Sequence, residues 1–284
     1  MVEKQVKTNY HTHCTYCDGK EPIGNFVNKA VELNYDQLGF SSHAPVPFEN
    51  DFGIREEQIP EYTKEIDGFK VRCPSLQLFY GLECDFIPGM TKPFAFFKNQ
   101  FGLDYIIGGV HLVRPENSDN IWFIDGSKRE IYDNGLRDFF GGNVKKAVTR
   151  FWEQSFEMIE TEQFDVIAHF DKIKMHNQKR YFTEEEEWYK LLVDHCIELI
   201  RCKQLIVEIN TRGIYKGRCP DYYPSDYALA QIAKHRIPMV VSTDAHKSEE
   251  LAEGRDAAIE HLKSMGIKFL MYRKNDQWEE YAIV

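Results

Sequence analysis

Short apolar runs alternate with amphipathic segments along the whole chain. Seven runs are rich in Val, Ile, Phe and Tyr, as buried strands are, and they span residues 6–10, 37–42, 76–83, 104–110, 164–168, 204–209 and 238–243. Between them, apolar residues recur at helical spacing, which predicts helices over 22–34, 144–161, 183–201, 225–235 and 248–263. This alternation predicts an α/β protein built on a parallel sheet, either open or closed into a barrel.

Polar residues refine the prediction for the helix over 183–201. The segment begins with TEEEE, where Thr183 is suited to capping and the glutamates suit the positive end of a helix dipole. We therefore interpret the acidic run as a helix start rather than a cation site. His195 shares the apolar stripe of this helix and is expected in the core. Three other histidines are expected in loops or on helix surfaces: His176, His235 and His261.

Residues 112–143 interrupt the alternation. The segment mixes aromatic, glycine and charged residues, which is typical of a long insertion that covers a binding site. A plain surface excursion is the alternative. Because no Gly/Ser linker, low-complexity segment or internal repeat occurs elsewhere, we expect a single domain over residues 1–284 that carries this insertion as a lid or loop.

Composition and charge narrow the class of protein. The 284 residues are 43% hydrophobic, enough for a full core, and the net charge of −10 disfavours a nucleic-acid-binding surface that depends on bulk positive charge. The first ten residues lack the apolar core of a signal peptide, and no run approaches the length needed to span a bilayer. With seven scattered cysteines and no export signal, we expect a cytoplasmic protein with free thiols and no membrane partner.

Polar residues stand at the carboxyl end of every predicted strand. Six of the seven runs end in side chains that are good metal ligands, namely His11, His13, His43, Glu83, His111, His169, Asp244 and His246. The sixth run ends instead in Asn210, Thr211 and Arg212. In a parallel α/β barrel these ends converge on one face, so the pattern predicts a shared metal site there.

Spacing and donor type support this prediction. In His11-x-His13 and Asp244-x-His246, residues two apart in an extended chain point to the same side, so both members of each pair can face one pocket. Together with Asp18 the candidates are too many for one catalytic zinc and sufficient for two or three ions. Imidazole and carboxylate donors suit Zn, Fe or Mn, and carboxylates can bridge two ions.

A second pair near the first strand, Cys14-x-x-Cys17, is another candidate for metal binding or redox chemistry. It has no partner pair at zinc-finger spacing and no thioredoxin-like strand–CxxC–helix context. We interpret both cysteines as incidental thiols at the rim of the pocket.

Six fragments, taken in order, resemble the polymerase-and-histidinol-phosphatase (PHP) family. They are HTH after the first strand, SSHAP, GLECDF, GGVH, AHFD and STDAH, and they span nearly the whole chain. The longer strings NYHTHCTYCDGK and EINTRGIYKG are most similar to the stand-alone histidinol-phosphatase branch. The resemblance implies a distorted (β/α)7 TIM-like barrel with its metal site at the carboxyl ends of the strands.

The resemblance also implies a trinuclear centre with ligands at matching positions. One metal would take His11, His13, Glu83 and Asp244, a second the bridging Glu83, His111 and His169, and a third Asp18, His43 and His246. Asp18 departs from the histidine that many relatives have there, an exchange that would alter the affinity for the third metal or its identity.

The activity implied is hydrolysis of L-histidinol phosphate to L-histidinol and phosphate, a step of histidine biosynthesis. A metal-bridging hydroxide would attack phosphorus, and the metals would hold the phosphoryl oxygens. The proton for the leaving alkoxide would come from Asp244, His246 or water.

The phosphate group also needs a cationic partner from the protein. Arg212 stands at the strand end without metal ligands, so we expect it to point into the same pocket. Arg180, with Tyr181 beside it, is a second candidate, and a surface salt bridge is the alternative for either arginine. In the insertion we expect Trp122, Phe123 and Asp125 to enclose an imidazole and meet an ammonium group, with plain packing as the alternative.

Three other functions remain open. A phosphoesterase of the same family that acts on nucleotides or nucleic acid is the main rival, although the acidic charge weighs against a nuclease. A metal-dependent amidohydrolase also has an H-x-H motif early in its chain. That class typically also has a bridging carboxylated lysine or its equivalent at a later strand end, and no predicted strand here ends in lysine. A metal-binding protein without activity is the third.

Overall fold

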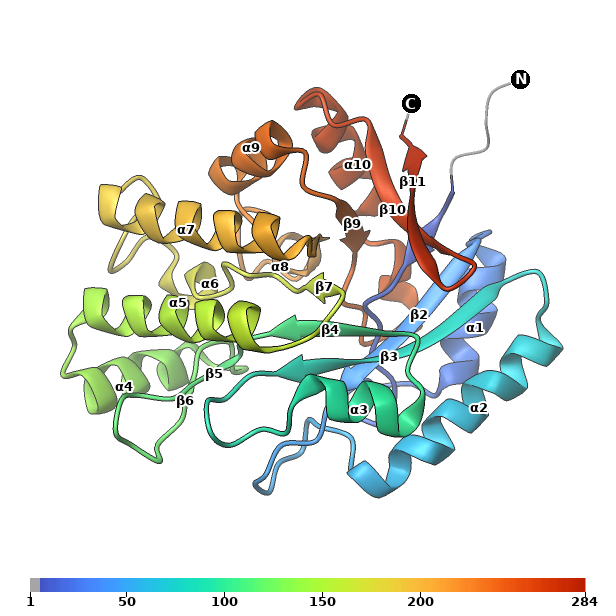
Figure 1. The fold of residues 1–284 in the computed structure, drawn as a ribbon, viewed down its shortest axis with the longest axis horizontal. Coiled ribbons are helices and arrows are strands. Elements are labelled where there is room, and N and C mark those ends of the chain that lie inside the picture. Colours follow the sequence, from blue (N-terminus) through green and yellow to red (C-terminus); the bar gives the residue numbers. More distant parts are fainter. Residues whose placement is uncertain (1–5, 284) are drawn as a thin grey trace.

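The computed structural model describes residues 6–283, and it is built around a seven-stranded parallel sheet (Figure 1). Its strands follow one another in sequence order around the sheet. They are β1 (Thr8–Asn9), β2 (Gln37–His43), β3 (Gln77–Asp85), β4 (Tyr105–Gly109), β7 (Val166–Ile167), β8 (Ile206–Asn210) and β9 (Met239–Ser242). All seven predicted strands are therefore confirmed, several of them shorter than their apolar runs.

The first and last strands meet and close the sheet into a barrel. Thr12 and Ala245 form a parallel bridge, in which the His13 N–H donates to the Ala245 carbonyl at 2.8 Å. In the other direction the Ala245 N–H donates to the His11 carbonyl at 3.2 Å. The predicted fold, a distorted (β/α)7 TIM-like barrel, is thus confirmed.

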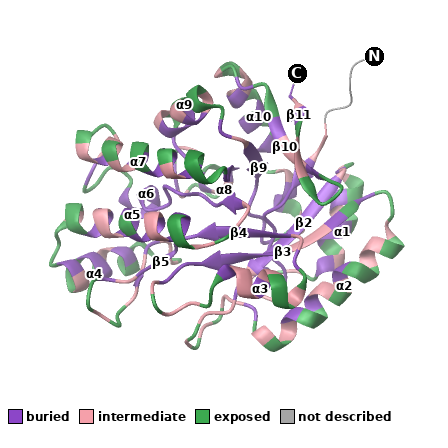
Figure 2. Cartoon of the chain, in the orientation of Figure 1, coloured by how far each residue is buried: buried purple, intermediate pink, exposed green. Residues whose placement is uncertain are grey.

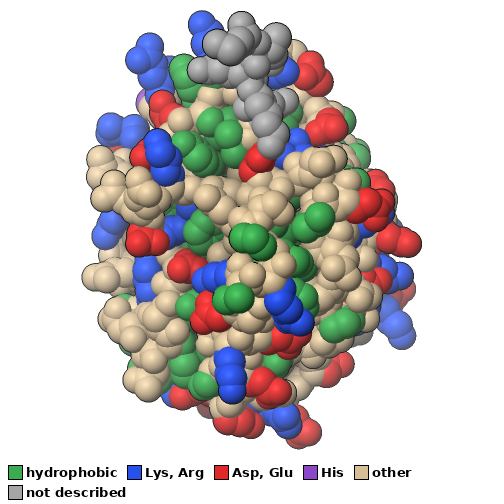
Figure 3. All heavy atoms as spheres, turned by 90° about the vertical axis from the view of Figure 1, so that its right-hand side faces the viewer, with side chains coloured by type: hydrophobic (Ala, Val, Ile, Leu, Met, Phe, Trp, Pro, Cys, Tyr) green, Lys and Arg blue, Asp and Glu red, His purple; other side chains and the backbone are tan. Residues whose placement is uncertain are grey.

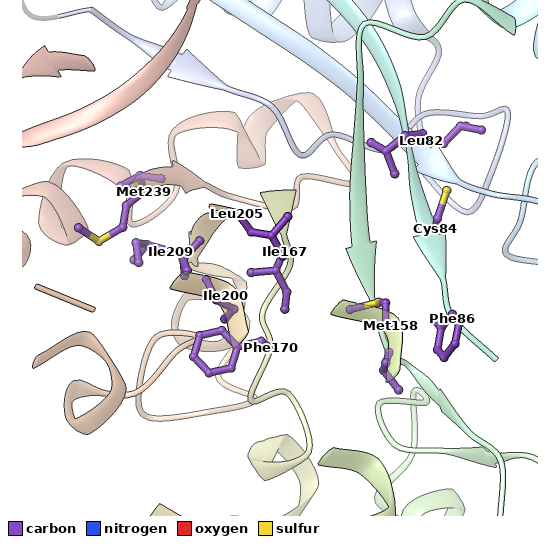
Figure 4. Packing of buried hydrophobic residues seen from close by; sticks show 14 of the residues in the cluster. Leu82, Cys84, Phe86, Met158, Ile167, Phe170, Ile200, Leu205, Ile209 and Met239 are labelled. Atoms are coloured by element: carbon purple, nitrogen blue, oxygen red, sulfur yellow. The ribbon is translucent and has the colours of Figure 1, made fainter. Parts of the chain in front are cut away.

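Two apolar layers hold the barrel together. The larger one lies between the strands and the surrounding helices, where Figure 4 shows Leu82, Ile167 and Met239 among the packed side chains. A smaller cluster contains Tyr10, Tyr105 and other strand residues. Because the strands are covered on both faces, they are buried along almost their whole length, while the helices turn exposed residues outward (Figure 2).

Most of the predicted helices form where the helical spacing placed them. These helices are α1 (Ile23–Glu32), α5 (Val144–Thr161) and α9 (Asp226–His235). The helix predicted over 248–263 is divided into a short 3-10 helix η2 (Ser248–Ala252) and α10 (Arg255–Ser264). The division falls at Gly254, whose φ of +71° belongs to the left-handed region that breaks a right-handed helix.

The predicted cap at Thr183 is wrong, because α7 (Glu187–Lys203) begins four residues later. The Thr183 N–H donates to Glu186 Oε1 at 2.8 Å, so residues 183–186 form a turn that precedes the helix. His195 lies on the exposed side of α7 with its ring edge against Phe156, which corrects its expected place in the core. His176 is buried rather than on the surface, and its Nε2 contacts the Gly126 carbonyl at 2.7 Å.

Several elements have no counterpart in the sequence prediction. The helices are η1 (Glu56–Gln58), α2 (Ile59–Arg72), α3 (Phe94–Phe101), α4 (Arg129–Phe140), α6 (Lys174–Asn177) and α8 (Arg212–Tyr215). The strands are β5 (Leu112–Val113) with β6 (Trp122–Phe123), and β10 (Phe269–Lys274) with β11 (Gln277–Ala282), which form two antiparallel hairpins. The insertion over 112–143 therefore contains β5, β6 and α4 rather than a long irregular loop.

The second hairpin covers the amino-terminal end of the barrel. The Trp278 ring packs edge-on against Tyr10 at 4.9 Å and against Tyr105 at 6.3 Å between ring centroids. Arg273 extends this contact, because its backbone N–H donates to the Tyr10 hydroxyl at 2.9 Å. The hairpin thus shields one end of the barrel, and the opposite end remains for the polar side chains.

The molecular surface mixes charged and apolar side chains. On the face shown in Figure 3, hydrophobic side chains form small patches separated by Lys, Arg, Asp and Glu. Among the described residues, none of the helices combines the length and the apolar character that crossing a membrane requires.

Candidate metal centre and active site

The polar side chains at the carboxyl ends of the barrel strands converge on one site. His11 and His13 follow β1, His43 ends β2 and Glu83 lies in β3. The remaining strand-end side chains come from the other side of the barrel, and they are His111, His169, Asp244 and His246. Parallel strands bring these ends together, and the structure places all nine candidate ligands, Asp18 included, in one continuous cluster.

Four side chains surround the first candidate metal position. Glu83 Oε2 lies 3.1 Å from His11 Nε2 and 3.4 Å from His13 Nε2. Asp244 Oδ1 lies 3.4 Å from the same His13 atom and 3.8 Å from the same His11 atom. The four donors therefore face one small volume between β1, β3 and β9.

The second candidate position uses the other oxygen of Glu83. Its Oε1 lies 2.9 Å from His169 Nε2 and 3.4 Å from His111 Nε2, and the two imidazole nitrogens are 3.2 Å apart. Because each oxygen of one carboxylate faces a different pair of histidines, Glu83 is placed to bridge two ions.

The third candidate position lies nearer the solvent. Asp18 Oδ2 is 3.2 Å from His246 Nε2, and Asp18 Oδ1 is 3.9 Å from His43 Nε2. The His43 ring also reaches Glu83, with Nδ1 at 3.0 Å from Oε2, so it links this position to the other two.

Unsatisfied polar atoms show that this cluster fits metal ions. Five buried side-chain atoms of the cluster make no hydrogen bond to any described residue, namely His11 Nε2, His13 Nε2, His43 Nδ1, Asp18 Oδ1 and Glu83 Oε2. A buried polar atom without a hydrogen bond costs free energy, and a cation shared by these five atoms would satisfy them together. Their imidazole and carboxylate chemistry is that of a divalent transition-metal centre.

Electrostatics keep two of the donors, Glu83 and His13, in forms that bind metal. Burial opposes ionisation of Glu83, yet the surrounding imidazoles of His11, His43 and His111 hold the pKa of this carboxyl well below its usual range. Burial, with His246 and His43 close by, lowers the pKa of His13 well below its usual value. An ionised carboxylate and a neutral imidazole are the forms that coordinate metals.

Two carboxylates that the sequence prediction missed hold the ligand rings in place. Glu208 Oε1 lies 2.6 Å from His11 Nδ1, and Glu208 Oε2 accepts a hydrogen bond from the backbone N–H of His169 at 3.1 Å. Asp85 Oδ1 lies 3.0 Å from His111 Nδ1. A carboxylate behind an imidazole ligand fixes its tautomer and orientation. The sequence does contain a sign of the role of Glu208: it is a charged residue within LIVEIN, an otherwise apolar run that forms a buried strand.

Two ligands adopt backbone conformations that L-residues rarely take. Asp244 has φ of +52° and His169 has φ of +22°. Such conformations cost free energy and persist where surrounding contacts impose them, which is common at functional sites.

A cavity of about 580 Å³ opens over the cluster. Three predicted substrate-binding residues line it, namely Arg212, Phe123 and Asp125. Lys172, which the sequence prediction missed, lines it as well, and its Nζ lies 3.1 Å from Asp125 Oδ2. Arg212 is held at the rim of the cluster, because its Nη1 donates to the Asp244 carbonyl at 2.5 Å. Two cations therefore stand beside the metal ligands.

The other predicted substrate-binding residues lie elsewhere. Trp122 is buried in the core and donates its indole N–H to the Tyr132 carbonyl at 3.0 Å. Arg180 forms a two-pronged salt bridge with Asp133 at 2.7 and 2.8 Å, and Tyr181 stacks beside it at the surface. None of the three lines the cavity, so the prediction that they contact substrate is corrected. Trp122 has the alternative role of packing, and Arg180 forms the alternative surface salt bridge.

The cysteines of the CxxC pair have different surroundings. Cys14 is buried in the hydrophobic core, which corrects its predicted place at the pocket rim. Cys17 lies beside the cluster, with Sγ 3.5 Å from His13 Nδ1. Burial raises the pKa of Cys17 to about 11, so its sulfur stays a neutral thiol.

Comparison with known proteins places this geometry in a family. The PHP domain family matches residues 9–212. A protein of Deinococcus radiodurans, named as an inferred histidinol-phosphatase, is 25% identical over 251 residues, which cover 87% of this chain and 89% of that protein.

Solved structures agree with the fold. A candidate histidinol phosphatase from Listeria monocytogenes has a TM-score of 0.78 at 21% identity, covering 88% of this chain and 99% of that one. The histidinol phosphate phosphatase of Lactococcus lactis, solved with zinc, L-histidinol and phosphate, has a TM-score of 0.69 at 17% identity, covering 96% of this chain and 98% of that one. At these identities the likeness establishes the barrel fold.

Proposed function

The chain belongs to the PHP domain family, and on that premise we propose that it is a metal-dependent phosphomonoesterase acting on L-histidinol phosphate. The products would be L-histidinol and inorganic phosphate. The relatives named for this activity support the substrate, as does the Lactococcus lactis structure with both products bound.

One observation carries the proposal. The bridging carboxylate Glu83 faces two histidine pairs, and two cations, Arg212 and Lys172, line the same cavity. A cluster that holds divalent ions next to fixed cations is suited to the negative charge of a phosphoryl group.

We propose that the cluster holds two or three divalent ions, with Zn, Fe and Mn all compatible with its donors. Bound at these positions, such ions polarise phosphoryl oxygens and make bound water acidic enough to act near neutral pH. Asp18 would supply the third position with a carboxylate, a harder donor than an imidazole.

The protein's own groups orient the substrate and manage the proton. Arg212 and Lys172 are placed to bind phosphoryl oxygens. Asp244 Oδ2 accepts a hydrogen bond from the Asn210 side-chain amide at 3.3 Å, and although burial opposes ionisation, His11 and Arg212 hold the pKa of this carboxyl well below its usual range. Asp244 is therefore ionised and would pass a proton to the leaving group only after taking one up from the attacking water, while His246 at the cavity and water are the other proposed sources. Phe123 and residues 125–127 form one wall, which is the part we assign to the predicted lid.

Thiol chemistry fits a reducing compartment. All seven cysteines are free, and an oxidising compartment would select against exposed thiols such as Cys202. We propose that the protein works in the cytoplasm.

Kinetics on a sample of known metal content test the proposed function. The purified protein, analysed for metals, is assayed on L-histidinol phosphate, AMP and short oligonucleotides. We expect kcat/KM to be highest for L-histidinol phosphate by at least about tenfold, and a His13→Ala variant to lose metal and turnover together. Equal or greater activity on AMP or oligonucleotides would contradict the substrate assignment and favour the nucleotide-directed rival.

A further inference from the structure

L-Histidinol phosphate carries an ammonium group close to its phosphate ester, and the cavity must accommodate this charge. The sequence pattern pointed to Asp125 as its partner. However, Asp125 Oδ2 lies 3.1 Å from Lys172 Nζ, which is salt-bridge distance. Because its charge is already matched, Asp125 is a poor partner for a second cation.

Most other carboxylates that line the cavity are also engaged. Asp18, Glu83 and Asp244 face the candidate metal positions. Asp85 supports the His111 ring at 3.0 Å.

Glu250 accepts from Arg212 at 3.4 Å and pairs with Lys216. One carboxylate of the cavity is left. Within residues 6–283, Asp51 makes no hydrogen bond and no ion pair, although it lines the same cavity. Its negative charge is therefore available to a ligand.

The loop that carries Asp51 is held against the cluster. Asn50 Oδ1 accepts from the backbone N–H groups of Phe52 and Gly53 at 3.2 and 2.7 Å, and the Ile54 N–H donates to the His43 carbonyl at 2.9 Å. Gly53 is needed there, because a Cβ would stand 2.9 Å from the Ala44 carbonyl oxygen. Asp51 is thus presented from a loop fixed to a metal ligand.

Aromatic rings accompany Asp51 at the cavity. The Phe52 ring lies 5.8 Å from the His43 ring and 6.3 Å from Phe123, and both phenylalanines line the cavity. Two edge-on phenyl rings offer an apolar face on which an imidazole can pack.

Unpaired cations occupy other parts of the cavity lining. Lys20, Arg218 and Lys247 line it and form no ion pair with any described residue. They attract a phosphate and repel an ammonium group, so the ammonium is excluded from their surroundings. Among the residues that line the cavity, Asp51 is thus the one whose negative charge remains available to the ammonium group.

We propose that Asp51 binds the ammonium group of the substrate and determines its selectivity, with Phe52 and Phe123 flanking the imidazole. The inference rests on the proposed function, because it assigns the same cavity a particular part of that substrate. It makes Asp51 a specificity residue that does not touch the reacting phosphorus.

An analogue without the ammonium group tests the assignment. The kcat/KM values of Asp51→Asn and of the wild type are compared on L-histidinol phosphate and on 3-(imidazol-4-yl)propyl phosphate. This analogue lacks only the amino group and retains the imidazole. We expect Asp51→Asn to lower kcat/KM for L-histidinol phosphate about tenfold, mainly through KM, as loss of one charge-assisted contact would. The value for the analogue should stay within about twofold of the wild type.

Glu49→Gln is the matched control. Glu49 is exposed on the same loop, carries the same charge and does not line the cavity, so its substitution should leave kcat/KM unchanged for both substrates. An equal loss on both substrates in Asp51→Asn, or the same selective loss in Glu49→Gln, would overturn the assignment.

The two levels of the proposal fail in different ways. If the wild type prefers AMP or oligonucleotides to L-histidinol phosphate, the proposed function fails, and the role of Asp51 fails with it. If the wild type prefers L-histidinol phosphate and Asp51→Asn keeps that preference over the analogue, only the role of Asp51 is wrong.

Discussion

In the candidate metal cluster, the two ring nitrogens of His11 have different partners. In His11, Nε2 faces Glu83 while Nδ1 lies 2.6 Å from Glu208. Both carboxylates are buried, and they raise the pKa of His11 well above its usual value although burial opposes it. The outer carboxylate therefore decides how the ring is oriented and how strongly it donates to a metal.

Removing only the charge of Glu208 tests this role. We expect Glu208→Gln to weaken metal binding on the order of 10- to 100-fold, since the amide keeps the size of the side chain and loses its negative charge. Competition with a chromophoric chelator measures the affinity without relying on activity.

Glu198→Gln provides the control for Glu208→Gln. Glu198 is exposed on α7 and pairs with Arg201 at 2.6 Å. It belongs neither to the candidate metal cluster nor to the lining of the cavity. Its substitution should leave the metal affinity unchanged. A Glu208→Gln protein with wild-type affinity would mean that orientation alone, without charge, is sufficient.

The site residues that sequence reasoning could find are those at strand ends. His111, His169 and Asp244 were identifiable because strand ends in a parallel barrel share one face. Glu208 and Lys172 were missed, because one lies inside a strand and the other in the turn after β7, where no periodicity marks a functional side chain. Trp122 was misassigned, since an aromatic residue in an insertion gives no sign of which way it faces.

At the scale of elements, helices α2 and α4 each contain one glycine, and the two glycines differ in what surrounds them. In α4, a Cβ at Gly135 would overlap the Trp122 ring, whereas in α2 a Cβ at Gly68 would meet only the end of the Arg72 side chain at 3.7 Å. The first glycine allows helix and hairpin to approach closely, and the second serves no packing purpose.

Alanine at these two positions should therefore have opposite effects. We expect Gly135→Ala to lower the free energy of unfolding by about 1–3 kcal/mol, because overpacking outweighs the gain in helix propensity. Gly68→Ala should raise it by about 0.5–1 kcal/mol. Urea unfolding of both variants measures the two values, and a stabilised Gly135→Ala would show that Trp122 can move aside at no cost.

Among the elements, the seven strands were predictable and several helices were not. Continuous apolar runs mark strands that are covered on both faces. Helix α2 buries only Ile59, Tyr62 and Ile66 among many charged residues, so its apolar stripe is weak. The hairpin of β10 and β11 is held by its contact with the end of the barrel, and such a contact leaves no local pattern.

The molecule as a whole separates stability from chemistry along the barrel axis. The hairpin packs Trp278 against Tyr10 and Tyr105 at the amino-terminal end, while the candidate metal ligands follow the strands at the carboxyl end. This division is general for barrel enzymes, where one end carries activity and the other carries stability.

Trp278→Ala should reveal the separation. We expect the free energy of unfolding to fall by about 2 kcal/mol, less than for a fully buried tryptophan because the side chain is partly exposed. The kcat/KM of the folded protein at 25 °C should remain within about twofold of the wild type. Loss of metal or activity at unchanged stability would show that the two ends of the barrel are coupled.

The bridge between Thr12 and Ala245 also has a consequence for biogenesis. His11 and His13 flank one partner of the bridge, and Asp244 and His246 flank the other, so the contact that closes the barrel also assembles the first metal position. Asp244 and His246 are translated long after His11 and His13, so a nascent chain that has not reached them presents the two histidines without Asp244. We therefore expect the first candidate metal position to form only when the segment around Ala245 has been made and meets the segment around Thr12.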